Sequence, residues 1–242
     1  MNKTCPVFPW LLLFGRTALF ILLQALFALA YAAGGSTGAW DGGAGCWPFG
    51  VTIANLIILA GLVVLFRREG QNYWEIFQVR REHLKSDLLV MLGFLVVAGP
   101  AGFLPNVLLA GWLFGDSQQV LPLLIHPLPY WAVYLSMLIF PLTQGLVELA
   151  VYFLYVMPRL AANGLPRWLA FGLPVLMLGL QHAALPLVFD LRFIAWRGLM
   201  FLPFSLVVGA LLAWRPRLLP YLAVVHVLMD VSFAAMLLGS AY

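Results

Sequence analysis

Long runs of apolar residues, separated by short polar connectors, dominate this chain of 242 residues. A membrane-spanning helix needs about 20 consecutive, mostly apolar residues. Seven stretches meet this requirement: 9–33, 47–66, 88–114, 130–157, 168–189, 196–213 and 218–238. The pattern predicts an all-α, polytopic transmembrane bundle of about seven spans, which forms a single integral membrane domain over residues 1–242. An eighth span would result if Pro100 and Pro105 split the third stretch.

Composition strengthens the membrane prediction. Hydrophobic residues make up 64% of the chain and charged residues 9%, with a mean hydropathy of +0.99. Soluble domains carry about 25% charged residues, so lipid must surround most of this chain. The net charge of +4 does not indicate nucleic acid as a partner, because the basic residues lie in short loops between apolar runs. Two cysteines are too few for a disulfide framework.

The basic residues also predict an orientation. With a cytoplasmic N-terminus, only Arg192 and Arg197 fall on the outer side. The inner side then holds Lys3, Arg16, Arg67, Arg68, Arg80, Arg81, Lys85, Arg159, Arg167, Arg215 and Arg217. This bias predicts an inner N-terminus and an outer C-terminus. A bacterial plasma (inner) membrane suits a compact chain with short loops and no organelle address.

Two segments leave alternatives open. The stretch 9–33 ends in the A-x-A pattern of a cleaved signal peptide, but its length and its start before Arg16 favour an uncleaved helix. The polar segment 67–87 is predicted to be a cytoplasmic amphipathic loop. Its aromatic and basic residues alternate, which is typical of an interfacial helix on anionic headgroups but equally of a solvated connector.

Four ionisable residues stand out near the middle of the predicted spans: Glu148, His182, His226 and Asp230. Such groups cost a few kcal/mol in a bilayer and persist where they face the bundle interior. At a rise of 1.5 Å per residue, all four lie roughly 12–20 Å from the inner face. His226 and Asp230 are four residues apart and share one helix face. The shared depth predicts one polar site, with Gln144 and Gln181 as further candidates.

Each of these residues also has a structural interpretation. A lone histidine such as His182 often bridges helices, and His226 with Asp230 can form a self-neutralising pair. A carboxylate at Glu148 has no intrahelical partner, so it is the best candidate for a general base.

This residue set suits hydrolysis of a peptide bond. Glu148 would activate a water, and His182 and His226 would hold that water or stabilise the oxyanion. Asp230 would orient His226 or bind the oxyanion in its protonated form. We expect no cofactor, although His182, His226 and Glu148 could instead ligate a divalent metal such as zinc.

Three motifs in the C-terminal half resemble the CPBP family of intramembrane proteases, the CAAX prenyl protease 2 and Abi group. That family carries EExxxR, then FxxxH, then HxxxN or HxxxD. Here ELAVYFLYVMPRL (148–160) resembles the first motif and its closing Pro-Arg-Leu, LGLQH (178–182) the second, and HVLMD (226–230) the third. Leu149 and Phe153 replace the second Glu and the Arg of the first motif.

The resemblance implies a catalytic core over residues 130–242, with Glu148, His182, His226 and Asp230 as catalytic residues. It predicts a glutamic-type intramembrane endopeptidase that acts on a membrane-anchored or lipid-modified polypeptide. The alternatives are a non-catalytic scaffold or immunity protein of the same family, and a small transporter that uses these residues as a proton relay.

Overall fold

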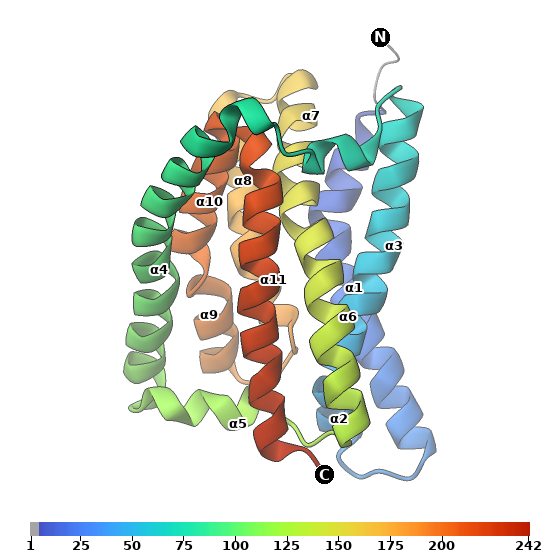
Figure 1. Ribbon diagram of the computed structural model, residues 1–242. Coiled ribbons are helices and arrows are strands. Elements are labelled where there is room, and N and C mark those ends of the chain that lie inside the picture. The colour runs from blue at the N-terminus through green and yellow to red at the C-terminus, as the bar shows by residue number, and fades with distance from the viewer. Residues whose placement is uncertain (1–4) are drawn as a thin grey trace.

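The computed structural model describes residues 5–242, and this part of the chain is helical with no strand (Figure 1). Lys3, which entered the orientation argument, lies outside the described residues. Six helical segments within this part are long and apolar enough to cross a membrane. The prediction of an all-α polytopic membrane bundle is therefore confirmed.

The longer helices are α1 (Val7–Ala33), α3 (Trp47–Arg68), α4 (Leu84–Phe114), α6 (Tyr130–Leu149), α8 (Arg167–Leu180), α10 (Leu202–Trp214) and α11 (Leu219–Ala235). The shorter ones are α2 (Ala39–Gly45), α5 (Leu121–Leu124), α7 (Met157–Ala162) and α9 (Leu191–Leu199). A π-helical segment, η4 (Ala150–Val156), joins α6 to α7. Short 3₁₀ segments are η1 (Tyr73–Phe77), η2 (Arg81–His83), η3 (Ser117–Val120), η5 (Gln181–Ala184), η6 (Pro216–Leu218) and η7 (Met236–Ser240).

The fifth predicted span, 168–189, differs from the prediction. Its α-helix, α8, has 14 residues and continues for one 3₁₀ turn, η5, before the helix ends. Pro186 explains this end, because the residue before a proline is disfavoured in helical geometry. The stretch is therefore shorter than the six segments that qualify as spans, and His182 lies in η5 at the point where the helix stops.

The third predicted span is not split. Pro100 and Pro105 both lie inside α4, which runs unbroken for 31 residues. This helix lies at the edge of the bundle and packs on α9 and α10 rather than closely on α11 (Figure 1). Most of its surface is exposed in the isolated chain, as expected for a helix that faces lipid.

The segment 67–87 forms no continuous helix. Between α3 and α4 it contains two short 3₁₀ turns, η1 and η2. Tyr73 is buried in the core, and its hydroxyl donates a hydrogen bond to the carbonyl oxygen of Leu146 on α6. Ile76 and Phe77 pack against the same core. The first half of the loop is thus tied to the helical bundle, while its contact with headgroups stays a prediction.

Helices α6 and α11 pack closely on each other. This packing sets the position of Glu148 on α6 relative to His226 and Asp230 on α11. Gly145 permits this approach, because its missing Cβ leaves room for α11. A Cβ at Gly145 would lie 2.6 Å from Val227 Cγ2 and 2.9 Å from the Ala223 carbonyl oxygen.

Gly145→Ala is therefore expected to lower the melting temperature in detergent, since overpacking of this kind costs about 1–3 kcal/mol. The matched control is Gly93→Ala on α4, where an added Cβ meets nothing within 4 Å. The control should melt at or slightly above the wild-type temperature, because alanine favours helix. Equal melting temperatures for the two variants would contradict the tight α6–α11 contact.

Candidate active site

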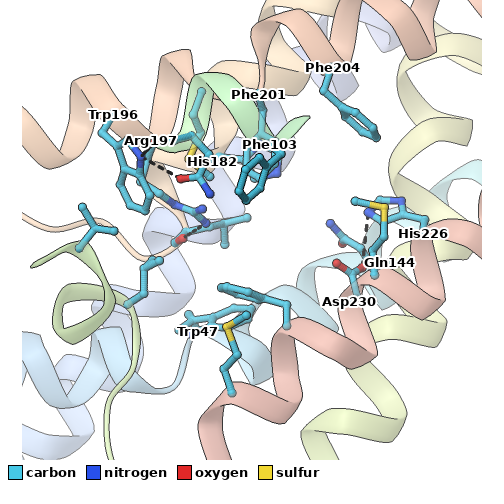
Figure 2. Close-up of a pocket in the computed structure, with 18 of the residues that line it drawn as sticks. Trp47, Phe103, Gln144, His182, Trp196, Arg197, Phe201, Phe204, His226 and Asp230 are labelled. Carbon is cyan, nitrogen blue, oxygen red and sulfur yellow. Dashed lines mark hydrogen bonds and ion pairs between the residues drawn. The ribbon is translucent and has the colours of Figure 1, made fainter. Parts of the chain in front are cut away.

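A cavity of about 640 Å³ lies inside the bundle, and all four predicted residues line it (Figure 2). Glu148 comes from α6, His182 from η5, and His226 and Asp230 from α11. The rest of the lining is mostly apolar and aromatic, including Trp47, Phe103, Phe140, Phe201, Phe204 and Phe233. The structure thus brings the four ionisable residues to one cavity, as their common depth predicts.

The two carboxylate oxygens of Glu148 have different surroundings. Oε1 accepts three hydrogen bonds: from Arg16 Nη1 at 2.9 Å, Gln144 Nε2 at 2.8 Å and Gln181 Nε2 at 2.7 Å. Oε2 accepts none of these and lies 3.2 Å from Nε2 of His226. The structure thus anchors one oxygen and leaves the other on the side of His226.

Arg16 is the residue that the sequence interpretation placed wrongly. It was predicted to be a flanking cation near the inner face, but its side chain is 0% exposed. Besides Glu148, it donates to the side-chain oxygens of Gln181 at 2.6 Å, Gln144 at 2.7 Å and Asn55 at 3.0 Å. An arginine ten residues into α1 is too deep for a loop, and a buried guanidinium needs this many acceptors.

A π-helical segment begins two residues after Glu148. Such segments are rare and are frequently found at functional sites. Here Tyr152 of η4 donates a hydrogen bond from its hydroxyl to Gln181 Oε1 at 2.9 Å. Tyr152 is completely buried, so η4 extends the polar network around Arg16 on the side away from solvent.

His226 lies between two carboxylates. Its Nε2 is 3.2 Å from Glu148 Oε2 and 3.4 Å from Asp230 Oδ2. No hydrogen bond reaches Asp230 Oδ2 from any of residues 5–242, although this oxygen is buried. A buried acceptor without a partner is costly in a protein interior, so this oxygen is suited to bind a water or a ligand in the cavity.

His182 lies elsewhere on the cavity wall. Its Nδ1 is 2.9 Å from the carbonyl oxygen of Leu178 and 3.2 Å from that of Gly179. Carbonyl oxygens only accept, so Nδ1 carries the proton and Nε2 is left as an acceptor. The ring packs against Phe201, with centroids 4.1 Å apart. These contacts hold His182 in one tautomer, but none joins it to His226 or Asp230.

The zinc alternative gains no support from this geometry. Across residues 5–242, no three His, Cys, Asp or Glu side chains form a group that could hold a metal ion. Arg16 and the two glutamines already occupy Oε1 of Glu148. We therefore derive the chemistry of the site from the side chains alone.

Charged residues outside the cavity lining form structural contacts. Arg159 of the Pro-Arg-Leu sequence pairs with Glu69 and lies over the Tyr155 ring, which joins α7 to the end of α3. Asp190 pairs with Arg192 at 3.0 Å, and this hydrogen bond lowers the pKa of the Asp190 carboxyl. Arg197, the other arginine of the predicted outer side, forms no ion pair with any of residues 5–242.

Sequence reasoning missed Arg16, Asn55 and Tyr152 as members of the site. Arg16 and Asn55 carry a usable signal, because each polar side chain stands deep inside an apolar run. Tyr152 carries none, since an aromatic residue in a span is usually packing. Gln144 and Gln181, the weaker candidates, both bind Glu148 directly. The expectation that Glu148 has no partner on its own helix is therefore wrong, because Gln144 lies one turn earlier on α6.

Comparisons with protein families, curated proteins and solved structures found no match to this chain. The resemblance to the CPBP family therefore still rests on the three short motifs alone.

Proposed function

We propose that this protein is an intramembrane endopeptidase that hydrolyses a membrane-anchored or lipid-modified polypeptide. One observation carries the proposal. His226 Nε2 lies 3.2 Å from Glu148 Oε2 and 3.4 Å from Asp230 Oδ2. All three residues line a cavity inside an apolar bundle. A water held between them would have a base, an imidazole and a second acid within hydrogen-bonding range.

In this mechanism Glu148 acts as the general base. Its Oε2 takes a proton from a water in the cavity, and the resulting hydroxide attacks the peptide carbonyl carbon. His226, donating from Nε2, stabilises the negative oxygen that forms, with help from Asp230 when that acid is protonated. Glu148 then returns the proton to the leaving amine as the C–N bond breaks. Arg16, bound to Oε1, holds the carboxylate in position throughout.

Access from the bilayer supports a membrane-embedded substrate. Phe103 of α4 and Met229 of α11 both line the cavity, yet these two helices do not pack closely on each other. We propose that a polypeptide enters the site sideways between α4 and α11. Irregular backbone within a membrane is tolerated where it lines such a cavity, as at η5.

Arg16 also bears on the resemblance to the CPBP family. The family motif carries an arginine five residues after its first glutamate, where this chain has Phe153. Here α1 supplies a guanidinium directly to Glu148. The loss of the motif arginine is thus compatible with an active site, whereas the second glutamate is replaced by the apolar Leu149.

The proposed setting is a bacterial plasma membrane with the N-terminus cytoplasmic and the C-terminus outside. The start of α1 and the C-terminus lie at opposite ends of the bundle (Figure 1), which is compatible with this orientation. Arg16 is buried, so it no longer counts toward the positive-inside bias. The basic residues in the loops of the proposed inner side still outnumber those of the outer side, where Arg192 is the exposed arginine.

The proposal is tested with the purified protein in nanodiscs. A library of single-span peptides is added in heavy-oxygen water, and mass spectrometry detects new C-terminal carboxylates that contain one labelled oxygen. We expect labelled fragments that are absent from empty nanodiscs. A complete lack of fragments across the library would favour the scaffold alternative over the hydrolase.

A further inference from the structure

Arg197 is a buried cation that nothing in the proposed mechanism uses. Its side chain is 5% exposed and lines the cavity. Nη2 donates to the carbonyl oxygen of Leu185 at 2.8 Å, and Nε has no hydrogen-bond partner. No carboxylate among residues 5–242 lies within 4.0 Å of its guanidinium.

The other buried arginines each have a carboxylate partner. Arg16 pairs with Glu148, and Arg159 pairs with Glu69. Burying an uncompensated ion is costly, and proteins normally pair it or neutralise it. Near Arg197 the rings of Trp196 and Phe201, at 5.5 Å and 5.7 Å, offer only weak cation–π contacts. The guanidinium therefore lacks the negative partner that its burial requires.

Arg197 also has a defined place relative to the candidate active site. In Figure 2 it lies with His182, Trp196 and Phe201 on one side of the cavity, and His226 with Asp230 lies on the opposite side. The lining between the two sides is mostly apolar. A ligand that satisfies both sides would have an anionic group at one end and an apolar body that extends toward Glu148.

We propose that Arg197 binds the carboxylate of an apolar ligand chain whose body occupies the cavity. A planar guanidinium is well suited to a carboxylate, because it can donate two parallel hydrogen bonds. The identification of this ligand as a polypeptide rests on the proposed function. If that function holds, the carboxylate belongs to a polypeptide, at a position close to its scissile bond. A fatty acid carries the same chemistry, and the experiment separates the two sources.

The test measures binding to the full-length protein in nanodiscs by quenching of tryptophan fluorescence. One probe pair is an N-acetylated apolar tetrapeptide with a free C-terminal carboxylate and the same peptide as its amide. The second pair is dodecanoate and dodecanol. The variants are Arg197→Gln and, as a control, Arg192→Gln, which removes an exposed arginine that pairs with Asp190.

We expect the carboxylate of at least one pair to bind wild-type protein roughly tenfold more tightly than its neutral partner. Arg197→Gln should abolish this preference, and Arg192→Gln should retain it. A preference confined to the peptide pair identifies a polypeptide source, and one confined to dodecanoate identifies a fatty acid. Equal binding within both pairs would overturn the proposal, as would a preference that survives Arg197→Gln.

Two further results keep the test independent of folding and of catalysis. If Arg197→Gln does not fold, the comparison within each probe pair on wild-type protein still decides, and Arg197→Lys should retain part of the preference. A carboxylate preference without peptide cleavage would sink the hydrolase but leave the anion site. Cleavage with no carboxylate preference would contradict the anion site at Arg197 but leave the hydrolase.

Discussion

Replacing either Arg16 or Glu148 by glutamine is expected to destabilise the protein by about 3–5 kcal/mol, because each change leaves one buried charge without its partner. Both side chains are almost fully buried, and their closest atoms are 2.9 Å apart. Glu148→Gln, the obvious variant for testing a general base, would therefore lose activity partly through unfolding. The contact with Arg16 makes this variant alone uninformative.

The double variant Arg16→Gln, Glu148→Gln removes both charges together and keeps side chains that can hydrogen-bond to Gln144 and Gln181. Its loss of stability should be clearly smaller than the sum of the two single losses, with a coupling of about 0.5–3 kcal/mol. Thermal unfolding of all four proteins in the same detergent measures this cycle. Additive losses would contradict a direct interaction between the two residues.

His226→Gln is expected to reduce peptide cleavage by about 10²–10³-fold, which is the usual contribution of one oxyanion-stabilising donor. Its Nε2 faces both Glu148 Oε2 and Asp230 Oδ2. The flexible glutamine side chain does not hold a donor rigidly at this place, so the oxyanion loses its positioned donor. The melting temperature should change little, because the side chain is partly exposed to the cavity.

His83→Gln is the control for His226. It changes a histidine on the polar segment 67–87 whose only ionic contact among residues 5–242 is with its neighbour Glu82. Initial rates of fragment formation at equal concentrations of folded protein provide the measurement. Comparable rates for the His226 and His83 variants would remove His226 from the mechanism.

The common depth of the candidate residues could be predicted because depth in the membrane increases nearly in proportion to residue number along a spanning helix. At 1.5 Å per residue, counting from the span ends places Glu148, His226 and Asp230 in one layer. Intramembrane charges face the interior, so a shared layer on different helices implies a shared site. The spacing of four residues on α11 added that His226 and Asp230 lie on one face.

Counting along the sequence could not show which side chains pair with one another. Arg16 lies in the N-terminal part of a span, where a basic residue usually marks the inner flank, and only packing reveals that α1 carries it to Glu148. Arg197 follows Arg192 by five residues and looked like a second member of one polar loop. The early end of α8 depends on Pro186 and moves His182 out of regular helix, which depth counting ignores.

The central claim is that the Glu148 carboxylate activates the water that cleaves the peptide, and the charge-balanced double variant tests it most directly. The measurement is the rate at which labelled oxygen from heavy-oxygen water enters new carboxyl termini, at matched amounts of folded protein. We predict that Arg16→Gln, Glu148→Gln incorporates no label above empty nanodiscs while wild-type protein does. Incorporation by the double variant at the wild-type rate would contradict the account.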